Sequence, residues 1–184
     1  NAIKKNAFKK IFETVPEFTK ELLAFHEKSP VLNRYDVFKK SMGIMGKDSD
    51  DPLYETWVEE YKSETRSAIL KCPLVPGSLE LLKAAEKRGL PRILVSATPH
   101  QELLWIVDNR DLRPYFNDIF GVPPAKGQRL KDLLNTYQYQ GSDTLYIGDS
   151  VEDFEAAAGA GMDFIGRRGK HDFKGLGVPV FDDL

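Results

Sequence analysis

Two acidic residues, Asp149 and Asp153, follow an apolar run in the sequence. Residues 144–148 read Thr-Leu-Tyr-Ile-Gly, and Asp149 and Asp153 follow within a segment of helical periodicity. This pattern predicts a buried strand, a tight turn and a helix. Because ligands of open α/β sheets bind where strands deliver their carboxyl ends, Asp149 would lie at a binding edge. A carboxylate there suits a hard cation such as Mg²⁺, which takes oxygen ligands.

A purely structural interpretation of the same residues is also available. Ser150 and Asp153 have the spacing of a capping box, in which a serine and an acid three residues later satisfy free backbone N–H groups. Asp149 could then be an ordinary turn residue. These residues alone leave both interpretations open.

Two further polar side chains are expected at the same edge of the sheet. Ser96 ends a short strand, residues 92–96, and precedes a helix whose free N–H groups suit a phosphate. Residues 98–101, Thr-Pro-His-Gln, are typical of a capping box for that helix. Lys126 follows Val-Pro-Pro-Ala and precedes another helix, although a lone lysine is most often simply solvated. Hydroxyl, ammonium, helix N–H groups and a cation are the parts needed to hold a phosphoryl group and neutralise its charge.

The C-terminal part of the sequence alternates strand and helix patterns. Expected strands are 92–96, 118–121, 144–148, 163–166 and 178–181, and expected helices are 79–88, 98–109, 127–137 and a segment from 151. This alternation predicts a parallel sheet with helices on both faces. A basic cluster, Arg167, Arg168 and Lys170, follows the 163–166 strand. A solvated loop is the favoured interpretation of that cluster, although its strand ends at the same edge as Asp149.

Residues 1–70 carry four amphipathic helix patterns and suggest a compact bundle. Pro16 separates the first helix from the second. Ser29-Pro30 and Asp51-Pro52 are each a capping residue followed by proline, and they are expected to open the third and fourth helices. The change of pattern places a boundary between two domains near residues 71–76.

Composition and charge exclude several classes of partner. The net charge of −2 gives no overall attraction to nucleic acid or to an anionic membrane. No apolar run approaches the ~20 residues that span a bilayer. The single cysteine, Cys72, cannot form a disulfide within the chain, which fits a reducing cytoplasm.

The order of these segments resembles a known family. Ser96-Ala97-Thr98 after a strand, then Lys126, then the run from Gly148 to Asp153, resembles motifs II, III and IV of the haloacid dehalogenase (HAD) superfamily. Residues 1–72 look like the helical C1 cap of its phosphoglycolate phosphatase and β-phosphoglucomutase branch. The resemblance implies a HAD-like Rossmannoid α/β core over residues 73–184, with a parallel sheet and helices on both faces.

The resemblance also implies roles for the site residues. Ser96 and Ala97 would bind the transferring phosphoryl group, and Lys126 would stabilise its charge. Asp149 would be a Mg²⁺ ligand, and Asp153 either a second ligand or a residue that holds the first ligands in place. In the helical part, Arg34 is a candidate for contacting the leaving group of the substrate.

One motif of the family is missing from the sequence. Motif I is an Asp-x-Asp at the end of the first core strand, and its first aspartate is the nucleophile. The Asp-x-Asp at Asp48–Asp50 follows no apolar strand and enters a helix, so it does not qualify. In this branch motif I precedes the cap and is expected upstream of Asn1. We therefore expect strands 92–96 and 144–148 to be parallel but not hydrogen-bonded to each other, with a slot for one strand between them.

These observations predict a Mg²⁺-dependent phosphatase that forms a phospho-aspartate and acts on a small phosphorylated metabolite. The alternatives are a phosphomutase of the same family or a non-catalytic HAD-like binding domain. The sequence does not predict the identity of the substrate or the oligomeric state.

Overall fold

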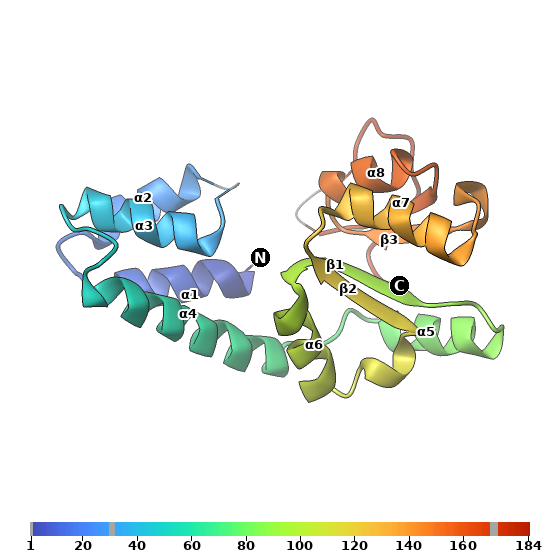
Figure 1. The fold of residues 1–184 in the computed structure, drawn as a ribbon, viewed down its shortest axis with the longest axis horizontal. Coiled ribbons are helices and arrows are strands. Elements are labelled where there is room, and N and C mark those ends of the chain that lie inside the picture. Colours follow the sequence, from blue (N-terminus) through green and yellow to red (C-terminus); the bar gives the residue numbers. More distant parts are fainter. Residues whose placement is uncertain (1, 30–31, 170–172) are drawn as a thin grey trace. The chain divides into compact units, whose positions relative to one another are not determined.

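The chain divides into two compact units, Asn1–Cys72 and Pro73–Leu184. The computed structural model describes residues 2–29, 32–169 and 173–184 (Figure 1). Pro30 and Lys170, on which two of the sequence predictions bear, therefore lie outside the described residues. Within the described ranges, no helix is both long enough and apolar enough to cross a membrane.

The first unit is entirely helical in its described part, as the amphipathic patterns predict. Its helices are α1 (Ala2–Phe12), α2 (Thr19–Glu27), α3 (Arg34–Ile44) and α4 (Pro52–Lys71). Asp51 caps α4 by accepting a hydrogen bond from the N–H of Leu53 at 2.9 Å, with Pro52 as the first helical residue, as predicted.

The predicted start of the third helix at Ser29-Pro30 is wrong. The helix begins at Arg34 because Asn33 provides the cap. The side-chain oxygen of Asn33 accepts hydrogen bonds from the N–H groups of Tyr35 and Asp36, at 2.9 and 3.0 Å.

Aromatic side chains form the centre of the helical unit. Phe12, Phe38 and Trp57 are fully buried, and Phe12 meets both of the other rings edge-on, at centroid distances of 6.4 and 5.6 Å. Such edge-to-face pairs add to the stabilisation that comes from burying the rings. The indole N–H of Trp57 donates to the hydroxyl of Thr14 at 3.3 Å, so its polar atom is also satisfied.

We expect Phe38→Ala to lower the free energy of unfolding of the helical unit by roughly 3–5 kcal/mol, because it removes a buried ring and leaves a cavity. Urea denaturation followed by circular dichroism measures the change. Phe181, which is 52% exposed, provides the matched control: Phe181→Ala should stay within about 0.5 kcal/mol of the parent protein. Equal effects of the two changes would contradict the assigned core.

The second unit alternates strands and helices. Its helices are α5 (Ser78–Lys87), α6 (His100–Asn109), α7 (Lys126–Tyr137) and α8 (Val151–Ala158). Its strands are β1 (Ile93–Pro99), β2 (Asp118–Val122), β3 (Leu145–Gly148), β4 (Asp163–Arg167) and β5 (Val180–Phe181). Every recorded strand pairing is parallel. Helix α6 contacts β1 and β2, whereas α7 contacts β1 and α8 contacts β3 and β4 (Figure 1).

The strands form two hydrogen-bonded groups, β1-β2 and β3-β4-β5. Among the described residues, no ladder joins β1 to β3. The prediction that these two strands do not pair directly is therefore confirmed. One edge of each strand is left without a partner strand in the described part of the unit.

The end of β1 differs from the prediction. The strand continues through a register shift to Pro99, and α6 begins at His100 without a side-chain cap, so the capping box at residues 98–101 is wrong. The reason is a close approach by β2. A Cβ atom on Gly121 would lie 2.4 Å from the carbonyl oxygen of Thr98 and 2.6 Å from the Cα of His100. The N–H of Gly121 instead donates to Nδ1 of His100 at 3.2 Å.

Candidate active site

A nearly buried ion pair joins two helices of the α/β unit. Lys126 is the first residue of α7, and Asp153 is the third residue of α8. The ammonium of Lys126 contacts Oδ1 of Asp153, and the two side chains are only 10% and 8% exposed. Lys126 is therefore not the solvated lysine that its isolated position in the sequence also allowed.

The other carboxylate oxygen of Asp153 fixes the loop after β3. Oδ2 accepts hydrogen bonds from the hydroxyl of Ser150 at 2.7 Å and from the N–H groups of Ser150 and Asp149, at 3.1 and 3.2 Å. The N–H of Asp153 donates in return to the Ser150 hydroxyl at 3.1 Å. The predicted capping box is thus present. A single carboxylate orients both the loop and Lys126.

These contacts set the ionisation of Asp153. Burial raises the pKa of its carboxyl, but the hydrogen bonds from Lys126, Ser150 and Tyr146 and the charge of Lys126 together outweigh burial, so the pKa is lowered overall. Tyr146 on β3 donates to Oδ1 at 3.1 Å. Burial first, and then the negative charge of Asp153, raise the pKa of Tyr146, so it remains a neutral donor. The sequence pattern placed Tyr146 only within an apolar strand. The signal that could have pointed to its role is that a buried tyrosine hydroxyl needs a hydrogen-bond partner.

Gly148, at the end of β3, lies where there is no room for a side chain. A Cβ atom on Gly148 would lie 2.4 Å from the Cβ of Asp153 and 2.7 Å from its Cγ. Any larger residue would push Asp153 away from the loop. The glycine at position 148 therefore follows from the position of the Asp153 side chain.

Asp149 itself is exposed at the carboxyl end of β3. No described residue donates a hydrogen bond to its carboxylate, so both oxygens are available. The described residues contain no group of three or more His, Cys, Asp or Glu side chains that could hold a metal ion. A single free carboxylate nevertheless fits Mg²⁺, which is usually held by one or two carboxylates, substrate phosphates and water.

Ser96 and Ala97 lie in the last part of β1. The hydroxyl of Ser96 donates to that of Thr98 at 3.1 Å and accepts from the Thr98 N–H at 3.1 Å, and Ala97 is exposed. Helix α7, which carries Lys126, packs against β1. The structure thus links Lys126, Asp149 and Asp153 by direct hydrogen bonds. It links Ser96 to them only through the packing of α7 on β1.

Arg34, the candidate from the helical unit, lies at the start of α3. Its guanidinium lies over the rings of Tyr35 and Tyr61, at 5.2 and 5.7 Å from their centroids. These cation–π contacts give it a structural role within its own unit.

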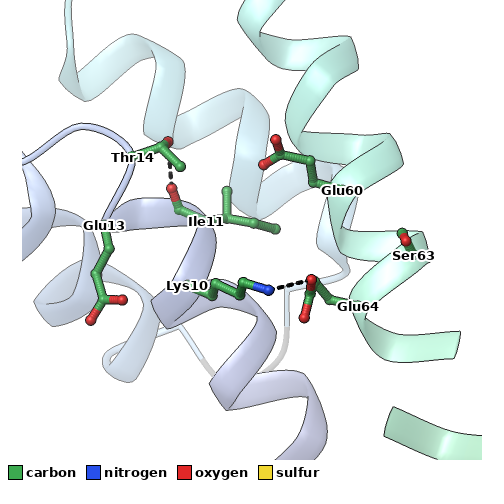
Figure 2. Close-up of a pocket in the computed structure, with 7 residues that line it drawn as sticks. All are labelled: Lys10, Ile11, Glu13, Thr14, Glu60, Ser63 and Glu64. Carbon is green, nitrogen blue, oxygen red and sulfur yellow. Dashed lines mark hydrogen bonds and ion pairs between the residues drawn. The ribbon is translucent and has the colours of Figure 1, made fainter. Parts of the chain in front are cut away.

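A hollow in the helical unit lies between α1 and α4 (Figure 2). It is lined by Lys10, Ile11, Glu13, Thr14, Glu60, Ser63 and Glu64. None of the predicted site residues is among them. Its lining has three glutamates and a single lysine, and Lys10 is already paired with Glu64, so this hollow does not suit a phosphate.

We expect Lys126→Met to cost roughly 3–5 kcal/mol of folding stability at pH 7, because it leaves a buried carboxylate without its cation. Lys131→Met, an exposed change on the same helix, should cost less than about 0.5 kcal/mol. Denaturant unfolding of both variants measures the difference.

The loss of stability caused by Lys126→Met should depend on pH in a definite direction. The pKa of Asp153 is lowered from 3.8 in the folded state, so its stabilising contribution is complete above that value and is lost as pH falls through the folded pKa. The gap in stability between the parent protein and Lys126→Met should therefore be widest near neutral pH and narrow below about pH 4. A gap that is constant from pH 7 to pH 3 would contradict the assigned pair.

Comparison with known proteins places this arrangement in a family. The chain is 25% identical, over 125 residues, to the phosphoglycolate phosphatase of Rhodobacter capsulatus; the match covers 65% of this chain and 56% of that protein. The chain spans about half the length of the curated relatives it matches.

Two solved structures share the fold. A candidate β-phosphoglucomutase from Thermotoga maritima is 18% identical with a TM-score of 0.74, covering 98% of this chain and 86% of that one. CbbY from Rhodobacter sphaeroides, in complex with phosphate, is 16% identical with a TM-score of 0.69, covering 99% and 87%. The sequence model of haloacid dehalogenase-like hydrolases matches residues 1–161. The fold is thus HAD-like, a Rossmannoid α/β core accompanied by helices, and the chain belongs to the family of haloacid dehalogenase-like hydrolases.

Proposed function

We propose that this protein is a Mg²⁺-dependent phosphatase that acts on a small phosphorylated metabolite through a phospho-aspartate. One observation carries the proposal. The carboxylate of Asp153 holds the ammonium of Lys126 and the loop of Asp149 together, and the Asp149 carboxylate is left free. The likeness to a phosphoglycolate phosphatase supports the same reaction class. The single cysteine fits a cytoplasmic place of action.

Each site residue has a role in this proposal. Lys126 stabilises the charge that develops on the phosphoryl group, and its low exposure strengthens that effect because little water screens it. The hydroxyl of Ser96 can rotate from Thr98 towards a phosphoryl oxygen, and Ala97 continues that binding segment. Asp149 is the Mg²⁺ ligand, and the bound cation would neutralise phosphate charge. Asp153 positions the loop and the lysine rather than binding the metal directly.

The nucleophile requires a further strand. We propose that an aspartate at the end of a strand between β1 and β3 attacks the phosphorus atom. The unpaired edges of these two strands support this placement, because backbone groups inside a core require hydrogen-bond partners. The Asp48–Asp50 segment is unsuitable, since it forms a turn between α3 and α4. We also propose that the helical unit acts as the cap, with Arg34 as a candidate contact for the leaving group.

We expect Asp149→Ala in the full-length protein to abolish Mg²⁺-dependent release of inorganic phosphate while leaving the melting temperature unchanged, because the exposed carboxylate serves the cation and not the core. Asp163→Ala is the matched control, since Asp163 is an exposed aspartate at the opposite end of the same strand pair. A phosphate-release assay across phosphorylated metabolites measures turnover. Undiminished turnover in Asp149→Ala would refute the metal role, and an isomerised sugar phosphate without released phosphate would indicate a mutase.

We expect the phospho-aspartate to form outside Asp48 and Asp50. Borohydride reduction of the acyl phosphate during turnover, followed by peptide mass spectrometry, identifies the labelled residue. The label should fall on an aspartate of an Asp-x-Asp that ends an apolar strand. A label on Asp48 or Asp50 would contradict the proposed placement. Phosphate release without any label would contradict the phospho-aspartate, and the absence of both label and phosphate release would favour a non-catalytic domain.

A further inference from the structure

Arg167 lies beside the loop that carries Asp149. It is the last residue of β4, and the parallel register of β3 and β4 pairs Gly148 with Gly166. Asp149 and Arg167 are therefore the next residues along two neighbouring strands, both at the carboxyl edge of the sheet. Ligands of such sheets bind at this edge.

The guanidinium of Arg167 has no protein partner in the described part of the chain. The residue is half-buried, and its Nε atom is buried without a hydrogen-bond acceptor. No carboxylate of the described residues lies within ion-pair distance. Because a buried polar group without a partner is costly, a guanidinium in this state is suited to an anionic ligand.

Two other arginines of this unit, Arg129 and Arg168, have partners for their guanidinium groups. Arg129 also has a buried Nε, but its Nη2 donates to the carbonyl oxygen of Pro123 at 3.0 Å and its guanidinium lies 4.9 Å from the ring of Phe120. Arg168 is exposed and forms an ion pair with Asp182 at 3.4 Å. Arg167 has neither kind of contact.

Arg167 and Asp149 face a common small space next to Gly169. A Cβ atom on Gly169 would lie 3.5 Å from Nη1 of Arg167 and 4.0 Å from Oδ2 of Asp149. The two side chains approach the same point without forming an ion pair with each other. Lys126, in contrast, has a carboxylate of the chain as its partner, Asp153.

We propose that Arg167 binds an oxyanion of the substrate, alongside the carboxylate assigned to the metal. This inference rests on the proposed phosphatase function and names a further substrate-binding residue for it. The planar guanidinium can hold two oxygens of a phosphate or a carboxylate at once. The oxyanion is either the phosphoryl group itself or a carboxylate on the leaving group.

The test compares Arg167→Met with Arg168→Met in the full-length protein. Methionine preserves apolar volume and removes the charge, and Arg168 is the adjacent arginine with a partner of its own. Calorimetric titration with inorganic phosphate in the presence of Mg²⁺ gives the affinity, and thermal unfolding gives the stability. Arg167→Met should weaken phosphate binding about tenfold or more if the guanidinium holds the phosphoryl group. Arg168→Met should leave it unchanged.

A pair of substrates separates the two sources of the oxyanion. The KM values for phenyl phosphate and for carboxyphenyl phosphate should rise together in Arg167→Met if Arg167 holds the phosphoryl group. If it holds a leaving-group carboxylate, only the KM for carboxyphenyl phosphate rises, and phosphate affinity is unchanged. Either pattern supports the proposal.

The proposal and the phosphatase function can fail separately. Parent-like phosphate affinity and KM values in Arg167→Met overturn the inference about Arg167, whereas Mg²⁺-dependent hydrolysis by the parent protein leaves the function standing. Phosphate binding that depends on Arg167 without hydrolysis of any ester overturns the function alone. A melting temperature that falls in Arg167→Met, rather than staying level or rising, assigns a structural role and also overturns the inference.

Discussion

The carboxylate of Asp153 is the interaction on which the candidate site depends. It accepts five hydrogen bonds or ion-pair contacts, from Lys126 and Tyr146 on one oxygen and from the Asp149–Ser150 loop on the other. A buried carboxylate is tolerable only when it is paired in this way. Its position therefore requires a cation at the start of α7, a hydroxyl on β3 and a glycine at residue 148, and these constraints explain the local sequence.

The Asp153 carboxylate affects Lys126 and Asp149 in opposite ways. It neutralises Lys126 and holds its ammonium in one place, which is the condition for an electrostatic contribution that costs no reorganisation during a reaction. It binds the backbone of Asp149 but leaves that side chain free. The fixed ammonium of Lys126 and the free carboxylate of Asp149 thus lie on either side of Asp153. This arrangement suits a phosphate and its metal ion, whereas a purely structural network would leave no carboxylate free.

Much of the local structure around the site could be predicted from the sequence, because it depends on residues that are close together in the chain. The capping box at Ser150 and Asp153 requires only a fixed spacing, and the strand at residues 145–148 requires only an apolar run. The errors arose where a distant contact decided the outcome. The start of α6 depends on how closely Gly121 approaches β1, and the start of α3 depends on Asn33 competing successfully with Ser29 as the cap. The hydrogen bond from Tyr146 to Asp153 likewise depends on how α8 packs on β3, and the position of Arg167 beside Asp149 depends on the register of β3 and β4.

The two ends of the β3-β4 pair show why position in the sheet, rather than residue type, distinguishes candidate binding groups from solvated ones. Asp163 begins β4 and Asp149 follows β3, and both are exposed, but only Asp149 lies at the carboxyl edge, beside Arg167, which has no partner among the described residues. Arg167 and Arg168 are consecutive, yet within the described ranges only Arg168 is paired with a carboxylate. Since strand neighbours alternate between the two faces of a sheet, one residue of such a pair can point to the site while the next is paired elsewhere. The sequence alone therefore does not distinguish Arg167 from Arg168. The register of β3 and β4 does, because it places Arg167 beside Asp149.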